Sequence, residues 1–319
     1  MKRFACCAIL LVLLTSTALV PSAFAGWVWS PQTGWIGPTG AVKDTPEEQL
    51  VFAVAFFDRH DYHRAQREFQ KLIKSYKESR EAAEAQYYLG RCQEEQGDYY
   101  KAFREYRKTI QTYPSTKRFG EILEREYQMG NYFLAGKKRK VLGMAALLPA
   151  RDKAVEIFQA IVDDGPFSEY GQLAQYKLGL SHLALEDYEE AVSAFEQLIS
   201  RYPDSPLVDD ARFQTTQASL KGTFKSDYDQ SPSDQAARQL DAFLKEFPQS
   251  ALAPQATAKL QELKERRAHH DYDVAQFYER RRHPAAARIY YQTIAQQFGE
   301  TSLAPRAVAR IQALQPSVH

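Results

Sequence analysis

Residues 89–114 read LGRCQEEQGDYYKAFREYRKTIQTYP, and residues 178–203 read LGLSHLALEDYEEAVSAFEQLISRYP. Each stretch has an Ala 12 residues after its Gly, an aromatic residue four further on, and a Pro eight beyond that. Two helices separated by a Gly-Asp or Glu-Asp turn satisfy this spacing. We expect the small Gly and Ala to let two antiparallel helices cross closely, with the aromatic side chain one turn along in the same seam.

The pattern of an Ala followed four residues later by an aromatic residue or Leu recurs six times along the chain. Successive alanines lie 37, 52, 37, 45 and 50 residues apart, so the uninterrupted repeat has 37 residues. The longer intervals predict insertions near 136–149 and 224–233 and a long helix from about 254 to 282. A fixed period of this size is typical of a solenoid of stacked helix pairs. The copies are Ala65/Phe69, Ala102/Tyr106/Pro114, Ala154/Phe158/Pro166, Ala191/Phe195/Pro203, Ala236/Leu240/Pro248 and Ala286/Tyr290.

The register of Leu-Gly, Ala, aromatic and Pro resembles the tetratricopeptide repeat (TPR). Two copies carry all five positions: Leu89, Gly90, Ala102, Tyr106 and Pro114, and Leu178, Gly179, Ala191, Phe195 and Pro203. The resemblance implies an all-α, right-handed superhelical solenoid of about six TPR-like helix pairs, closed by a short C-terminal helix over 303–314. It also implies that the first helix of each pair lines a groove.

The N-terminus has the organisation of a signal peptide, for which we assign residues 1–25. Lys2 and Arg3 precede an apolar run over 4–20, and an A-x-A-type cleavage site follows at 23–25. An uncleaved membrane anchor is the alternative. A Trp/Gly/Pro-rich segment over 26–45 comes next; its tryptophans, Trp27, Trp29 and Trp35, either cap the first repeat or dock on a partner.

Charge and cysteine content narrow the possible functions. Without Lys2 and Arg3, 39 of the 41 basic residues remain against 40 acidic ones, so no basic excess points to nucleic acid. Cys92 is the one cysteine beyond residue 25, which excludes a disulfide framework and suggests a buried packing residue. We find no phosphate-binding loop or catalytic motif, and we predict a non-enzymatic protein without cofactor or metal.

Two polar clusters are the only sequence support for the alternative of a metal-dependent enzyme. His60 and His63 lie beside Asp58 and Asp61, and His269 and His270 precede Asp271. Histidines at polar turns are more often solvated than metal-bound, which favours the absence of a metal.

A stripe of aromatic residues is the candidate binding site. The position three residues before the Gly faces the groove in a TPR, and it holds Leu50, Tyr87, Tyr127, Tyr176 and Phe213 here. Aromatic side chains suit an extended or helical peptide. The alternative is that they pack only between neighbouring repeats.

A second candidate feature is the basic run over 137–140. It either meets lipid head groups or an acidic partner, or is a solvated loop.

From about 172 to 306 the chain resembles the BamD family of outer-membrane protein assembly factors. The resemblance rests on LISRYPDSP at 198–206, YDQSP at 228–232, AFLKEFPQS at 242–250, and the stretch 272–288 that begins YDVAQFY. It implies a periplasmic scaffold that contacts the POTRA domains of the β-barrel insertase and other assembly-complex subunits. It also implies binding of unfolded outer-membrane protein peptides through their C-terminal aromatic signal.

On this resemblance, Phe277, Tyr278, Arg281 and Arg288 are expected to face the insertase, and Tyr127, Tyr176 and Phe213 the substrate. Family members are usually lipoproteins, but Cys6 and Cys7 lie too early for lipid attachment, so we expect indirect association with the outer membrane. A soluble periplasmic TPR adaptor of the Tol-Pal or cell-wall-synthesis type is the alternative. The expected segments are 1–25, 26–45, 46–168 (TPR-like repeats), 169–302 (BamD-like region) and 303–319 (C-terminal helix and tail).

Overall fold

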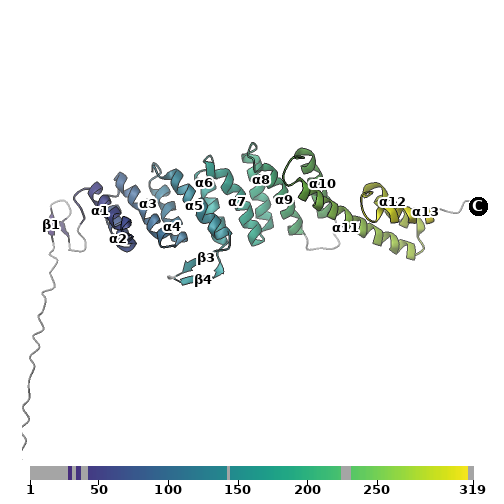
Figure 1. Cartoon of the computed structure of the whole chain (residues 1–319), viewed down its shortest axis with the longest axis horizontal. Coiled ribbons are helices and arrows are strands. Elements are labelled where there is room, and N and C mark those ends of the chain that lie inside the picture. The colour runs from purple at the N-terminus through teal and green to yellow at the C-terminus, as the bar shows by residue number, and fades with distance from the viewer. Residues whose placement is uncertain (1–27, 31–33, 37–41, 142–143, 224–230, 315–319) are drawn as a thin grey trace, which may run out of the picture.

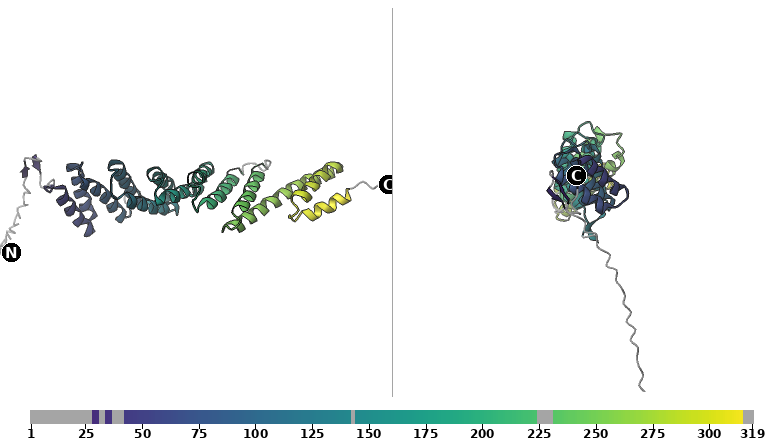
Figure 2. Two further views of the ribbon diagram at one scale, coloured as in Figure 1. Left: turned by 90° about the horizontal axis from the view of Figure 1, so that it is seen from above. Right: turned by 90° about the vertical axis from the view of Figure 1, so that its left-hand side faces the viewer.

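The computed structural model describes residues 28–30, 34–36, 42–141, 144–223 and 231–314. The predicted signal peptide over 1–25, Trp27 and most of the second insertion lie outside the described residues. Helix follows helix along one elongated row, with the first and last helices at opposite ends (Figure 1). Figure 2 shows the same row from above and end-on.

The described helices form six consecutive pairs and a closing helix, which confirms the predicted all-α TPR-like solenoid. The first three pairs are α1 (Pro46–Asp58) with α2 (Tyr62–Ser75), α3 (Arg80–Glu95) with α4 (Tyr99–Thr112), and α5 (Phe119–Leu134) with α6 (Asp152–Asp164). The next three are α7 (Glu169–Leu185) with α8 (Tyr188–Arg201), α9 (Val208–Thr223) with α10 (Ser231–Glu246), and α11 (Ala253–Arg280) with α12 (Pro284–Gln297). The closing helix is α13, Ala304–Ala313.

Two short antiparallel hairpins accompany the helices. One pairs β1 (Val28–Ser30) with β2 (Gly34–Ile36), and its register places Trp29 opposite Trp35. The other pairs β3 (Lys138–Val141) with β4 (Met144–Pro149), between α5 and α6. This hairpin projects from the row of helices (Figure 1). The insertion is therefore a hairpin and not an irregular loop, because strand pairing satisfies backbone groups that a loop would leave to water.

The close crossing inferred from Gly and the aromatic residue is present in three repeats. A Cβ added at each of these glycines would lie 2.5 or 2.6 Å from an aromatic carbon of the paired helix. All three rings are fully buried, so they cannot move away into solvent. Glycine therefore fixes the distance between the paired helices. The pairs are Gly90/Tyr106, Gly130/Phe158 and Gly179/Phe195.

The sixth copy of the repeat requires a correction of one residue. Ala287 and Tyr291 are fully buried, whereas Ala286 and Tyr290 are only partly buried. Ala287, Tyr291 and Ile294 follow helical spacing on the face that α12 turns to the core. Their burial shows that the copy is Ala287/Tyr291, so the assignment to Ala286/Tyr290 is wrong.

The long helix α11 connects the last two repeats. Leu260 and Leu263, in its first half, share a core with α9 and α10. Ala268 and Ala275, in its second half, share a different core with α12 and α13. The single helix therefore joins the C-terminal pair to the rest of the solenoid, and three of the four residues expected to face a partner lie at its C-terminal end.

Candidate partner-binding surfaces

Two members of the aromatic stripe lie in the core. Tyr87 is 1% exposed and Phe213 is 5% exposed. The Tyr87 hydroxyl donates a hydrogen bond to the Glu121 carboxylate of the next repeat. The ring of Phe213 lies 5.9 Å from that of Phe243. This burial favours packing over ligand binding for both residues, between repeats for Tyr87 and within the α9–α10 pair for Phe213.

The other two tyrosines of the stripe are half-buried, with part of each side chain reachable from solvent. The Tyr127 ring lies 5.8 Å from Phe158 and 5.5 Å from Tyr170. The Tyr176 ring lies 5.6 Å from Phe195. Burial, together with the charge of Asp210, raises the pKa of Tyr176 to about 12, so its hydroxyl stays protonated and able to donate at neutral pH. These two tyrosines are the members of the stripe that a peptide could contact.

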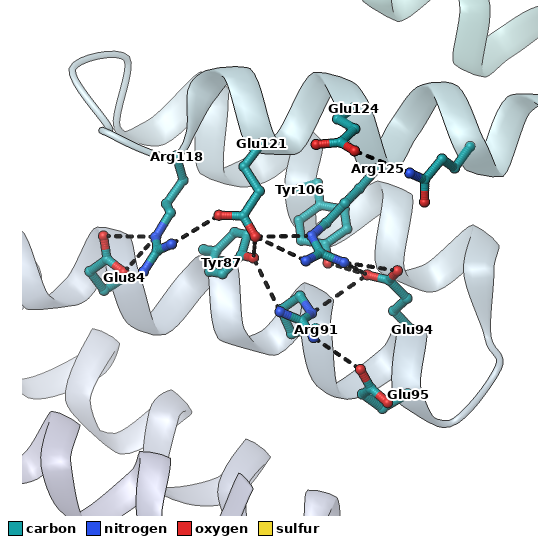
Figure 3. A network of polar contacts seen from close by, with 11 residues as sticks. Glu84, Tyr87, Arg91, Glu94, Glu95, Tyr106, Arg118, Glu121, Glu124 and Arg125 are labelled. Atoms are coloured by element: carbon teal, nitrogen blue, oxygen red, sulfur yellow. Dashed lines mark hydrogen bonds and ion pairs between the residues drawn. The ribbon is translucent and has the colours of Figure 1, made fainter. Parts of the chain in front are cut away.

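A lattice of ion pairs joins α3 to α5, which are the first helices of the second and third repeats (Figure 3). Arg118 lies 3.0 Å from Glu84 and 2.9 Å from Glu121. Arg125 lies 2.9 Å from Glu121 and 3.1 Å from Glu94. The two arginines therefore bridge acidic residues of both helices, and their charges are largely used within the fold.

The carboxylate of Glu121 is the centre of this lattice. Burial acts to raise its pKa, but hydrogen bonds from Tyr87, Arg125 and Arg118 outweigh burial and lower the pKa to about 2. The carboxylate thus stays ionised at any physiological pH. Sequence reasoning missed this lattice because the contacts that join α3 to α5 link residues 31 to 34 positions apart. Charges of opposite sign at repeat-length separation are the signal that could have found it.

At the end of α11, three of the four predicted partner-facing residues come together. Phe277 is 47% exposed, and the Arg281 guanidinium lies 5.3 Å from its ring. Tyr278 is half-buried between Phe277 and Tyr290. Its ring stacks on that of Tyr290, with ring centroids 5.7 Å apart. The fourth residue, Arg288, lies half-buried on α12. An exposed aromatic residue beside an arginine is a typical anchor in protein interfaces.

One residue of each polar cluster considered as a metal site has another partner. His60 Nδ1 lies 2.8 Å from the Tyr62 hydroxyl oxygen. Asp271 is buried and accepts a hydrogen bond from Arg267. Within the part of the chain that the structure describes, no three potential metal ligands lie together. Cys92 is buried, as expected for a packing residue, and burial raises the pKa of its thiol to about 12.

Comparison with known protein families gives two matches. The YfiO family, described as outer membrane lipoprotein, matches residues 150–315, which hold α6 to α13. A tetratricopeptide-repeat family matches residues 50–115, which hold most of the first two helix pairs. None of the helices in the described ranges is long and apolar enough to cross a membrane.

Among curated proteins, the outer membrane protein assembly factor BamD of Caulobacter vibrioides is 22% identical over 160 residues. The alignment covers 50% of this chain and 52% of that relative, so the chain spans about half the length of the curated relative it matches.

Solved structures of low sequence identity also resemble the chain. MamA from Desulfovibrio magneticus is 17% identical, with 66% of this chain and all of that one covered, at a TM-score of 0.33. The C-terminal part of a TPR protein from Cytophaga hutchinsonii is 15% identical, with 86% and 85% covered, at a TM-score of 0.34.

Proposed function

The chain belongs to the YfiO family of outer membrane lipoproteins, and we propose that it is a non-catalytic periplasmic scaffold for the assembly of β-barrel proteins in the outer membrane. The match over residues 150–315 is the observation that carries this proposal, because it spans more than half of the chain. The similarity to BamD of Caulobacter vibrioides, named as an assembly factor, supports the same process.

The partner surface we propose is the end of α11. Phe277 and Arg281 are exposed there, and they lie within the family match. The ring supplies apolar area and the guanidinium supplies charge, so together they can anchor a protein that offers an apolar pocket with an acidic rim. We propose that the POTRA domains of the barrel insertase are this partner. Tyr278 and Arg288 then form the supporting side of the contact.

The test is affinity capture from envelope extract with the tagged full chain. We expect the insertase to be captured, and the double variant Phe277→Ser/Arg281→Glu to retain less than about a fifth of it, because it removes a central anchor. Phe167→Ser/Arg201→Glu is the matched control, since Phe167 is 94% exposed on the turn before α7 and Arg201 is exposed at the end of α8. Absence of the insertase among proteins captured by the unaltered chain would end the assembly proposal, and capture of Tol-Pal proteins instead would favour the adaptor alternative.

We further propose that Tyr127 and Tyr176 contact unfolded barrel peptides. Replacing both by Ala should weaken binding of a peptide with an aromatic C-terminus about tenfold, because half-buried aromatic contacts commonly carry that much affinity. Fluorescence anisotropy with a labelled peptide measures the effect, and circular dichroism checks that the helices remain. Tyr188→Ala, a half-buried tyrosine on α8, is the control. Equal affinity of the double variant and the unaltered chain would assign both tyrosines to packing.

A further inference from the structure

Basic side chains repeat in register on α2 and α4. Each helix carries four Lys or Arg residues and one Glu. With the alanines Ala65 and Ala102 aligned, the basic residues fall at three equivalent positions in both helices. Equivalent positions in stacked repeats point in the same direction, so these residues form one surface. The equivalent pairs are Arg64/Lys101, Arg67/Arg104 and Lys71/Lys108.

The one acidic residue of each helix is held by a Gln on the first helix of its own repeat. Glu68 accepts a hydrogen bond at 3.0 Å from the side chain of Gln49 on α1. Glu105 accepts one at 2.6 Å from Gln86 on α3. Each carboxylate is thus held toward the first helix of its own repeat. Lys71, Arg64 and Lys101 pair with nearby acids.

Four basic side chains remain exposed and available. Arg67 and Lys74 on α2 and Arg104 and Lys108 on α4 are exposed, and no ion pair to them occurs among the described residues. We call these four residues the basic face. Their charges form no ion pairs among the described residues, unlike those of Arg118 and Arg125 in the α3–α5 lattice.

The basic face ends sharply at the third repeat. The position of Arg104 is taken by Glu156 on α6 and by Ser193 on α8. Acidic residues outnumber basic ones by four to one on α6 and by three to one on α8. The basic face therefore belongs to the two repeats that precede residue 150, where the YfiO match begins. It is a property of this chain outside the family region.

We propose that the basic face docks the solenoid on a membrane surface rich in anionic lipid head groups. Charge complementarity supports lipid: exposed basic side chains recur at equivalent positions of two neighbouring repeats, which suits a surface of repeated phosphates, although Glu156 and Asp163 of α6 line the same hollow as Arg104 and Lys108. An acidic protein would be expected to need an apolar anchor at the centre of its contact. The large hydrophobic side chains exposed in the described ranges all lie outside α2 and α4. A surface that can dock only through its charge suits a lipid surface better than an acidic protein.

The test is co-sedimentation of the full chain with vesicles of phosphatidylcholine alone or with a third of phosphatidylglycerol. We expect binding only to the anionic vesicles, and a steep loss of binding between 50 and 300 mM salt. A basic residue near an anionic surface contributes about fivefold in affinity, so the triple variant Arg67→Glu/Arg104→Glu/Lys108→Glu should bind roughly a hundredfold more weakly. The control Arg201→Glu/Arg238→Glu/Arg306→Glu changes the net charge equally at exposed sites elsewhere.

Each other outcome overturns the proposal. Equal binding to neutral vesicles would show apolar insertion, and equal loss in both triple variants would show a response to net charge alone. If the unaltered chain ignores anionic vesicles while the first triple variant loses an acidic protein in affinity capture, the basic face is a protein-docking surface. Capture of the insertase is tested separately with the Phe277→Ser/Arg281→Glu variant. A failure of the lipid-docking proposal therefore leaves the assembly proposal untouched.

Discussion

The Gly179→Ala chain is expected to unfold at a lower urea concentration than the unaltered chain, with a loss of about 1–3 kcal/mol. The new Cβ would lie 2.5 Å from Cε1 of Phe195. Since Phe195 is fully buried, its ring cannot yield without moving α8 away from α7. The cost is therefore overpacking at the helix crossing, and it exceeds the gain in helix propensity from replacing Gly.

Gly120→Ala is the matched control for this prediction. Gly120 lies in the first turn of α5, and a Cβ there would have no atom within 4 Å. Removing a glycine from a helix without a clash should stabilise the chain by about 0.5–1 kcal/mol. Urea midpoints followed by circular dichroism distinguish the two effects. Unfolding midpoints that shift in the same direction for both variants would contradict the role assigned to Gly179.

The same Gly and aromatic contacts explain why the fold could be predicted from the sequence. Small residues, an aromatic residue and a turn at fixed separations act within one helix pair, so the local sequence contains the information. The shift of the sixth copy to Ala287/Tyr291 could not be predicted, because no Gly marks the crossing there and burial alone decides between adjacent alanines. The β3–β4 hairpin had no helical period to reveal it.

The binding surfaces were less predictable because they depend on how one repeat packs on the next. Tyr87 and Phe213 occupy the same repeat position as Tyr127 and Tyr176, yet the first two are buried and the others are half-exposed. The lattice around Glu121 covers Tyr87, and it is held to the previous repeat by Tyr87–Glu121, Arg118–Glu84 and Arg125–Glu94. Position within a repeat fixes the direction of a side chain, but the neighbouring repeat decides how much of it solvent can reach.

The third repeat also differs from its neighbours at a buried polar position. In three repeats, the residue four positions before the small residue at the helix crossing is Gln. The side-chain amide of this Gln donates a hydrogen bond to a backbone carbonyl on the second helix of the repeat. Gln175 donates to Ala194 at 2.9 Å and Gln49 to Glu68 at 3.2 Å. The third repeat carries Glu126, which is 0% exposed, and neither carboxyl oxygen has a hydrogen-bond partner in the described part of the chain.

We expect Glu126→Gln to stabilise the folded chain by about 1–3 kcal/mol at pH 7.5, because the introduced amide restores a donor and removes an ionisable group from the core. Burial raises the pKa of Glu126 well above its usual range; the nearby charge of Arg107 opposes this shift and that of Asp164 adds to it. The Arg107 side chain is itself hydrogen-bonded to Asp164.

The stabilisation by Glu126→Gln should depend on pH in one direction. With the pKa raised on folding, the folded chain binds more protons than the unfolded chain above about pH 4.5, so its stability falls as pH rises toward the folded pKa. The amide does not titrate, and the difference between the two chains should therefore grow from pH 4.5 to 8 in urea titrations. Glu124→Gln, at an exposed position on the same helix, should show no such trend. A stability difference that stays constant over this range would mean that Glu126 is already ionised in the fold, held by Arg107 more strongly than burial opposes it.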